Sequence, residues 1–336
     1  MRTARILGEE GSWYHCVSRI VDRQMRVSKD EKERFRNIMR RVEEFSGVRI
    51  LTHSILDNHF HILLEVPERQ KVSDEELLRR MRLLYAKEYV SQFALSLKEC
   101  RKNGDNGAAE KLKERYTYRM YDLGEFMKTL KQRYTMSYNR RHERRGTLWE
   151  ERFKSVLVDW SRSEKTKELS SSAAMAAYID LNSVRAGIVS DPKEYRYSGY
   201  GEAVGGSKKA REGLMKVMGT LGCGGSWEEV SRAYRKLLYI RGKGTEKRPG
   251  FVAEEVKKVL KAGGKLSVGE ALRCRVRYFS DGVALGSREY VNGVFEKHRE
   301  RFGAKRKDGA RALRHGEWGG LCALRDLRLS VVTVPE

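Results

Sequence analysis

The sequence predicts an α+β protein, because segments with the period of a strand and segments with the period of a helix follow one another along its first part. Residues 13–20 alternate as a strand does, 49–56 and 59–66 are expected to be two further strands, and a helical pattern at 31–45 separates the first strand from the second. Beyond residue 226 helical patterns predominate. We therefore expect a sheet with helices packed on it, followed by a mainly helical C-terminal region.

Capping and turn residues mark the remaining elements of the first part. Ser73 followed by Glu76 is a capping pattern that starts a helix. Ser170–Ser172 caps an alanine-rich helix, and Asp57-Asn58 is typical of the turn between two strands. The expected segments are a helix at 73–97, a helix at 124–141, an extended stretch at 147–160 and a helix from 170 to about 182–187.

Composition predicts three parts of the chain. Residues 1–200 form the main domain, with a helical insertion at about 67–145. The stretch 201–225 is rich in Gly and Lys at its start and is expected to be a linker, and 226–336 is expected to be a helical, basic accessory region. The helices expected in that region are 226–239, 253–260, 267–276 and 287–299. The second and third of these are joined by a glycine turn, an arrangement typical of a helix-turn-helix.

A strong excess of positive charge indicates a polyanionic partner. The 69 Lys and Arg residues outnumber the 46 Asp and Glu residues, which gives a net charge of +23. Because solubility does not require so large an excess, nucleic acid is the first candidate. The alternative is a solvated basic surface that binds nothing in particular.

Cysteine usage and hydropathy predict a soluble cytoplasmic protein. The five cysteines are scattered and form no CxxC pair, which argues against a disulfide framework and against a zinc ribbon. No apolar segment of signal-peptide length precedes the first strand, and no stretch approaches the ~20 apolar residues of a membrane span.

Two pairs of polar side chains share a face by their spacing. In Asn58-His59-Phe60-His61 the period of two puts both imidazoles on one face of a strand, and neutral imidazole is a good ligand for divalent metals. On the alanine-rich helix, Tyr178 and Asn182 are four residues apart and also share a face. The alternatives are incidental histidines, a tyrosine that packs on the sheet and an amide at a helix end.

Four motifs occur in the same chain and in a fixed order. They are Tyr14-His15-Cys16-Val17-Ser18-Arg19, Asn58-His59-Phe60-His61, Gly146-Thr147-Leu148-Trp149-Glu150-Glu151-Arg152-Phe153-Lys154 and Tyr178-Ile179-Asp180-Leu181-Asn182-Ser183-Val184-Arg185-Ala186-Gly187. Together they resemble the REP-associated tyrosine transposases, which are single-tyrosine HUH transposases. The resemblance covers about 13–200, and four motifs in order are more specific than any one of them.

This resemblance implies a fold, a reaction and a site. The fold would be a ferredoxin-like antiparallel sheet with helices packed on it. His59, His61 and Asn182 would hold a Mg²⁺ or Mn²⁺ ion, and Tyr178 would be the nucleophile. The protein would then be a metal-dependent single-strand DNA endonuclease and strand transferase that acts on hairpin or palindromic DNA through a 5′-phosphotyrosine intermediate.

Several alternatives stay open beside this reading. Asp57 and Ser183 each stand where the family usually has Pro. A DNA-binding protein of the same origin that has lost cleavage is therefore one alternative. Tyr134 is the rival nucleophile. A zinc hydrolase would use His59 and His61 with His53 or His15. The sequence does not decide between a monomer and a homodimer.

Basic and aromatic residues suited to DNA are concentrated around the Gly146 motif, because cations follow phosphates and aromatic rings stack on bases. For the aromatic residues a place in the core is the alternative, and for the arginines a solvated face. The expected DNA-binding residues are Arg19, Lys131, Arg140, Arg141, Arg144, Arg145, Trp149, Arg152, Lys154 and Arg185.

Overall fold

A computed structural model describes residues 5–21, 27–161, 169–239, 266–325 and 332–333. The chain divides into two compact units. Unit 1 comprises Met1–Met25, Ile50–Leu64 and Glu150–Glu336, and unit 2 comprises Arg26–Arg49 and Glu65–Trp149.

Four strands form the predicted sheet. They are β1 (Trp13–Arg19), β2 (Arg49–Ile55), β3 (His59–Glu65) and β4 (Lys154–Val158), and they lie in the order β2-β3-β1-β4. β1 runs antiparallel to β4, with Trp13 opposite Val158. One helical segment separates β1 from β2 and another separates β3 from β4, and this connectivity with this strand order is that of a ferredoxin-like sheet. The α+β class is confirmed.

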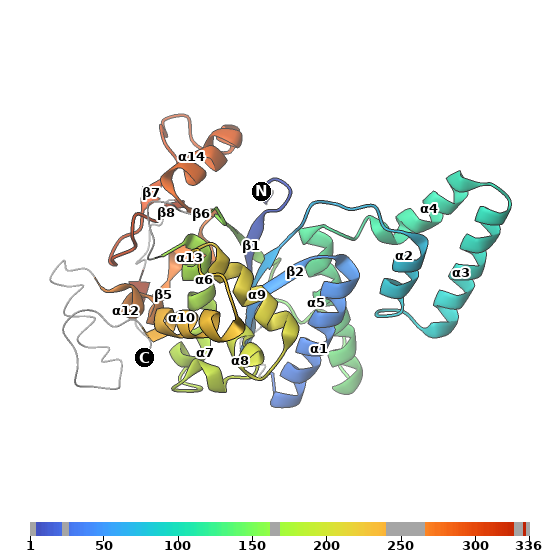
Figure 1. The fold of residues 1–336 in the computed structure, drawn as a ribbon, viewed down its shortest axis with the longest axis horizontal. Helices are drawn as coiled ribbons and strands as arrows, with labels where there is room; N and C mark the ends of the chain where they lie inside the picture. The colour runs from blue at the N-terminus through green and yellow to red at the C-terminus, as the bar shows by residue number, and fades with distance from the viewer. Residues whose placement is uncertain (1–4, 22–26, 162–168, 240–265, 326–331, 334–336) are drawn as a thin grey trace. The chain divides into compact units, whose positions relative to one another are not determined.

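The C-terminal region extends the same sheet (Figure 1). β6 (Ala284–Gly286) pairs parallel with β4, β8 (Cys322–Leu324) pairs antiparallel with β6, and β7 (Arg311–Ala312) forms the edge. A separate pair joins β5 (Arg275–Val276) to β9 (Val332–Thr333). Among its described residues from 266 onward, the helices are α12 (Val268–Arg273), α13 (Arg277–Asp281), α14 (Arg288–Lys297) and the short 3-10 helix η2 (Arg299–Arg301). This part therefore combines helices within the expected ranges 267–276 and 287–299 with strands that were not predicted.

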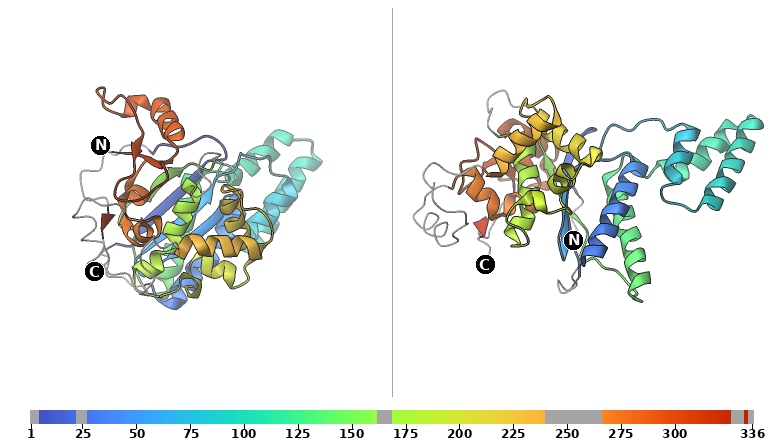
Figure 2. Two further views of the ribbon diagram at one scale, coloured as in Figure 1. Left: turned by 60° about the vertical axis from the view of Figure 1, so that its left-hand side comes forward. Right: turned by 60° about the horizontal axis from the view of Figure 1, so that its bottom comes forward.

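Helix α6 (Ser171–Asp180) lies at the centre of unit 1, and all ten of its residues are buried. Ser170 caps it by accepting a hydrogen bond from the Ala173 N–H at 3.1 Å, as predicted. Small alanine side chains let neighbouring elements approach on every side, and α9 (Lys208–Gly219) and α10 (Trp227–Tyr239) pack on it (Figure 2). The short α7 (Asn182–Arg185) follows α6 after a single residue, and the 3-10 helix η1 (Pro192–Glu194) comes next.

The expected linker at 201–225 is instead helical. α8 (Gly199–Val204) and α9 occupy most of it, and Leu214 and Val217 of α9 are fully buried. Its Lys and Gly residues are compatible with a helix because α9 needs only one apolar stripe to pack. Of the helix-turn-helix, 253–260 lies outside the described residues, and 267–276 contains α12 followed by β5.

Two glycines of α9 give a matched test of this packing. A Cβ at Gly213 would lie 2.5 Å from the Leu51 carbonyl oxygen and 2.9 Å from the Ile50 carbonyl oxygen, both in β2, whereas a Cβ at Gly219 would meet nothing within 4 Å. We expect Gly213→Ala to lower the free energy of unfolding by about 1–3 kcal/mol through overpacking. Gly219→Ala is expected to raise it by about 0.5–1 kcal/mol because alanine favours the helix. Urea denaturation of the two variants measures both changes, and equal effects would contradict the packing of α9 on β2.

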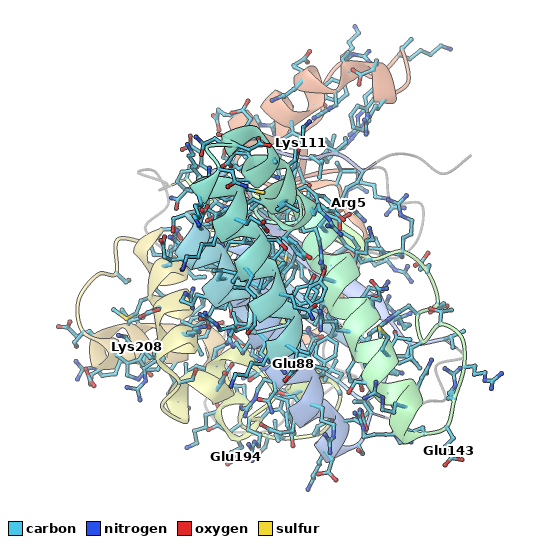
Figure 3. All side chains as sticks on the ribbon, turned by 90° about the vertical axis from the view of Figure 1, so that its right-hand side faces the viewer. Arg5, Glu88, Lys111, Glu143, Glu194 and Lys208 are labelled. Carbon is cyan, nitrogen blue, oxygen red and sulfur yellow. The ribbon has the colours of Figure 1, made fainter. Side chains whose placement is uncertain are left out.

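Unit 2 is helical. Its helices are α1 (Lys29–Ser46), α2 (Asp74–Met81), α3 (Lys87–Lys102), α4 (Asn106–Thr117) and α5 (Leu123–Arg141). α1 and α5 pack side by side (Figure 2). The single helix expected at 73–97 is two helices, capped by Ser73 as predicted, and α4 was not predicted. Exposed charged side chains project from α3 and α4, where Glu88 and Lys111 are labelled (Figure 3).

No helix in the described part of the chain is long and apolar enough to span a bilayer. All five cysteines are free thiols.

Candidate active site

A pocket of about 300 Å³ in unit 1 brings together six of the residues singled out from the sequence. Strands β1 and β3 supply one wall, and α6 with α7 supplies another. Among the residues that line it there is no Asp or Glu. The lining residues are Val17, Arg19, Leu56, His59, His61, Tyr178, Asn182, Arg185, Ala186, Arg275 and Ser280.

Strand periodicity places the histidines as predicted. Residues 59, 61 and 63 of β3 share one face, and Leu63 belongs to the same core cluster as Tyr178. This face of the sheet is therefore the one that α6 covers. On the neighbouring strand β1, the same alternation turns Val17 and Arg19 into the pocket.

A chain of hydrogen bonds fixes the proton position on His61. The Nδ1 atom of His15 lies 2.7 Å from the Phe279 carbonyl oxygen, and because a carbonyl only accepts, this nitrogen carries the proton. The Nε2 atom of His15 is then an acceptor, and it lies 2.8 Å from Nδ1 of His61. His61 therefore donates through Nδ1 and keeps a lone pair on Nε2.

His59 is held in the same tautomer by a different partner. Its Nδ1 atom lies 2.6 Å from Oδ1 of Asn58, which accepts the hydrogen bond. Its Nε2 atom therefore also carries a lone pair, as a metal ligand requires.

Burial keeps these imidazoles neutral. It lowers the pKa of His59 to about 3, with further contributions from the nearby charges of Arg19, Arg275 and Arg185. Burial also lowers the pKa of His15 to about 4 and places the pKa of His61 well below its ordinary value.

Tyr178 and Asn182 share the pocket, and Arg185 links them. The Arg185 guanidinium lies 4.0 Å from the centre of the Tyr178 ring. Its Nη2 atom donates to Oδ1 of Asn182 at 2.6 Å and to the Tyr178 carbonyl at 2.7 Å. Burial lowers the pKa of Arg185. The ring of Phe279 stacks on Tyr178 with centroids 4.8 Å apart, so the phenol is held on two sides.

Asp180 anchors the end of α6 that carries Tyr178. Its carboxylate accepts hydrogen bonds from the Thr52 hydroxyl at 3.0 Å, the Tyr234 hydroxyl at 2.6 Å and the Tyr200 N–H at 3.0 Å. Burial raises the pKa of Asp180 to about 7. Strand β2 and helix α10 thereby fix the position of α6 next to the pocket.

The donor atoms of the pocket are compatible with a divalent ion. Two Nε2 lone pairs are available, and the amide oxygen of Asn182 has a second lone pair beside the one that Arg185 occupies. Imidazole nitrogens suit transition metals and amide oxygens suit Mg²⁺ and Mn²⁺, so this mixed set fits Mn²⁺ at least as well as Mg²⁺. Among the described residues no group of three His, Cys, Asp or Glu is placed to hold a metal.

Two comparisons with known proteins found a match. Residues 10–103 match the family model described as "Transposase IS200 like". The chain is similar to the IS200-like transposases. A solved structure described as "Structure of the REP associates tyrosine transposase bound to a REP hairpin" matches with 14% sequence identity and a TM-score of 0.39, over 61% of this chain and 87% of that chain. No curated protein matches the sequence.

The segment that matches the IS200-like family model, 10–103, contains five of the eleven residues that line the pocket. It includes Arg19, His59 and His61, whereas Tyr178 and Asn182 come later in the chain. The family match supports a transposase function, and the roles of the individual residues stay predictions.

The rival nucleophile Tyr134 lies in α5 of unit 2 and does not line the pocket. It is 1% exposed, and its hydroxyl donates to Oε2 of Glu31 at 3.2 Å. Burial, followed by the charge of Glu31, raises the pKa of Tyr134. A buried, protonated phenol bonded to a carboxylate is poorly placed to attack DNA.

The zinc alternative loses support from the position of His15. Both ring nitrogens of His15 already have hydrogen-bond partners, Phe279 and His61. His53 is fully buried, and its Nε2 atom lies 3.7 Å from a carboxylate oxygen of Glu202.

The expected DNA-binding residues are divided between the two units. Arg19 and Arg185 line the pocket, and Arg152 and Lys154 lie elsewhere in unit 1. Lys154 pairs with Asp281 at 3.1 Å. The members in unit 2 are Lys131, Arg140, Arg141, Arg144, Arg145 and Trp149.

Arg141 and Trp149 of the unit 2 group have well-defined partners within the protein. Arg141 forms an ion pair with Glu31 at 2.7 Å. Trp149 is 8% exposed, and its Nε1 atom donates to Oγ1 of Thr135 at 2.9 Å. A stacked base needs an exposed ring face, so the structure favours the core alternative for Trp149. Arg140 and Arg145 are exposed.

Sequence reasoning missed two residues of the site, Arg275 and Ser280, and named His15 only as an alternative zinc ligand. The alternation in β1 that places Arg19 in the pocket also places His15 on that face, and this signal was available. Arg275 and Ser280 lie in the C-terminal region, and no local pattern connects them to the histidines.

Proposed function

We propose that this chain is a metal-dependent single-strand DNA endonuclease and strand transferase, a transposase that acts on hairpin or palindromic DNA through a 5′-phosphotyrosine intermediate. The observation that supports it most is one pocket that contains a phenol, two imidazoles with free Nε2 lone pairs, an amide and three arginines. The three arginines and the lack of lining carboxylates favour an anionic group such as a phosphate over an apolar ligand.

The residues of the pocket would divide the work as follows. Arg19 would bind the scissile phosphate in the pocket, Arg185 would add its positive charge beside it, and the Tyr178 oxygen would attack the phosphorus in line. The new bond joins that oxygen to the 5′ phosphate, the bond to the 3′ oxygen breaks, the phenol gives up its proton and the leaving 3′ oxygen takes one up.

His59, His61 and Asn182 would hold Mg²⁺ or Mn²⁺. When bound there, the ion supplies Lewis-acid polarisation of the phosphate oxygens. The ester to Tyr178 conserves the bond energy, so a second 3′ hydroxyl reverses the attack and joins strands.

The test uses the full chain and labelled hairpin DNA with single-stranded flanks, taken from the sequence next to its own gene. We expect a covalent protein–DNA adduct on a denaturing gel with Mn²⁺ and none with EDTA. Binding without any adduct in Mn²⁺ would overturn the proposal and support the non-catalytic DNA-binding alternative, which the departures at Asp57 and Ser183 motivate.

A further inference from the structure

Residues 272–280 of the C-terminal region contact Arg185, His15 and Tyr178, through two hydrogen bonds and one pair of stacked rings. The Leu272 carbonyl accepts a hydrogen bond from Nη1 of Arg185 at 2.6 Å, and the Phe279 carbonyl accepts one from His15 at 2.7 Å. The Phe279 ring stacks on Tyr178. Helix α12 packs against α6 and α7, and α13 packs against β1 and β4; Figure 1 labels these elements. This segment is therefore part of the wall of the pocket.

Arg275 is the cation that this segment contributes to the pocket. It lies in β5, whose next residue, Val276, is fully buried, so the alternation of the strand turns Arg275 outward. Its side chain is exposed and lines the pocket together with Ser280 of α13.

Arg275 and Arg185 differ in how far their guanidinium N–H groups are already used in hydrogen bonds within the protein. The guanidinium of Arg185 is partly buried and already donates to two main-chain carbonyls and to Asn182. The guanidinium of Arg275 is accessible from the pocket. A planar guanidinium with accessible N–H groups binds a phosphate through two parallel hydrogen bonds.

We propose that Arg275 is a phosphate-binding residue of the active site, which the C-terminal region supplies to hold a phosphodiester of single-stranded DNA at the pocket. This inference rests on the proposed function in so far as the pocket receives DNA, but it does not require cleavage. The C-terminal region would then complete the site, in addition to any contacts that it makes with DNA elsewhere.

Binding is measured in EDTA, where no cleavage is expected, by fluorescence anisotropy of labelled hairpin DNA with single-stranded flanks. We expect Arg275→Gln to weaken binding roughly tenfold, as loss of hydrogen bonds to a charged group does. The plot of log affinity against log salt concentration has a negative slope, and Arg275→Gln should reduce the size of that slope by about 0.7, the value for one phosphate contact on a single strand. Arg275→Lys should lie between wild type and Arg275→Gln, because it keeps the charge and loses the paired hydrogen bonds. Arg288→Gln is the control, since Arg288 is an exposed arginine of the same region outside the pocket lining.

Replacing single phosphates of the flank by neutral methylphosphonates identifies the partner. At one position Arg275→Gln should no longer weaken binding, because the contact is already absent there. Binding of Arg275→Gln that matches Arg288→Gln at every position, with an unchanged salt slope, would overturn the inference. If Arg275→Gln loses its effect on DNA binding at one methylphosphonate position but no adduct forms in Mn²⁺, phosphate binding by Arg275 would be supported and only the proposed cleavage would be contradicted.

Discussion

Tyr178→Phe is expected to abolish the Mn²⁺-dependent protein–DNA adduct and to leave the fold and DNA binding intact. The substitution removes one oxygen from a side chain that is 2% exposed. The ring keeps its stacking on Phe279 and its contact with the Arg185 guanidinium, because both involve ring atoms. Loss of the adduct would then reflect loss of the nucleophile, and thermal unfolding together with anisotropy checks the other two properties.

Tyr134→Phe is the matched control, since it removes the same oxygen from the other candidate. It breaks the hydrogen bond to Glu31, and Arg141 remains as a partner of that carboxylate. We expect a loss of about 1 kcal/mol in the free energy of unfolding and an adduct yield close to wild type. An adduct that persists in Tyr178→Phe and disappears in Tyr134→Phe would identify Tyr134 of α5 as the nucleophile.

The part of the site that could be predicted is the part encoded by local periods. A period of two places His59 and His61 on one face of β3, and a spacing of four places Tyr178 and Asn182 in one pocket, although α6 ends at Asp180 and Asn182 begins α7. Only the prediction that the two histidines lie next to Tyr178 and Asn182 required the resemblance to a known family. Such contacts depend on the packing of α6 on the sheet, which no local pattern encodes.

The C-terminal half could not be predicted to the same degree, for two physical reasons. Strands β6 and β8 are three residues long, too short to show an alternation, and β6 pairs with a strand more than a hundred residues earlier. The chain at 201–225 was expected to be a linker because its composition is rich in Gly and Lys. Gly213 is instead required by the close approach of α9 to β2, which a sequence pattern cannot distinguish from a flexible glycine.

His15→Ala is expected to weaken binding of Mn²⁺ to the protein about 10–100-fold, the cost typical of losing a partner that orients a metal-binding histidine. Nε2 of His15 accepts a hydrogen bond from the Nδ1–H of His61, and Nδ1–H of His15 donates to the Phe279 carbonyl. Without this acceptor, the Nδ1–H of buried His61 loses its partner, and the tautomer that leaves Nε2 free is no longer favoured. Electron paramagnetic resonance of free Mn²⁺, in the absence of DNA, measures the affinity independently of any reaction.

The variants His15→Gln and His15→Asn distinguish a role of His15 in orienting His61 from a role in packing alone. In His15→Gln the side-chain oxygen reaches about as far as Nε2 of the imidazole and can accept from His61, so most of the Mn²⁺ affinity should return. In His15→Asn the oxygen reaches only about as far as Nδ1, so the affinity should resemble that of His15→Ala. If the volume of the side chain were what matters, the two amides would differ little from each other. Equal Mn²⁺ affinity in Gln and Asn variants that both melt like wild type would therefore remove His15 from the metal site, and with it the link between Phe279 in the C-terminal region and the histidines.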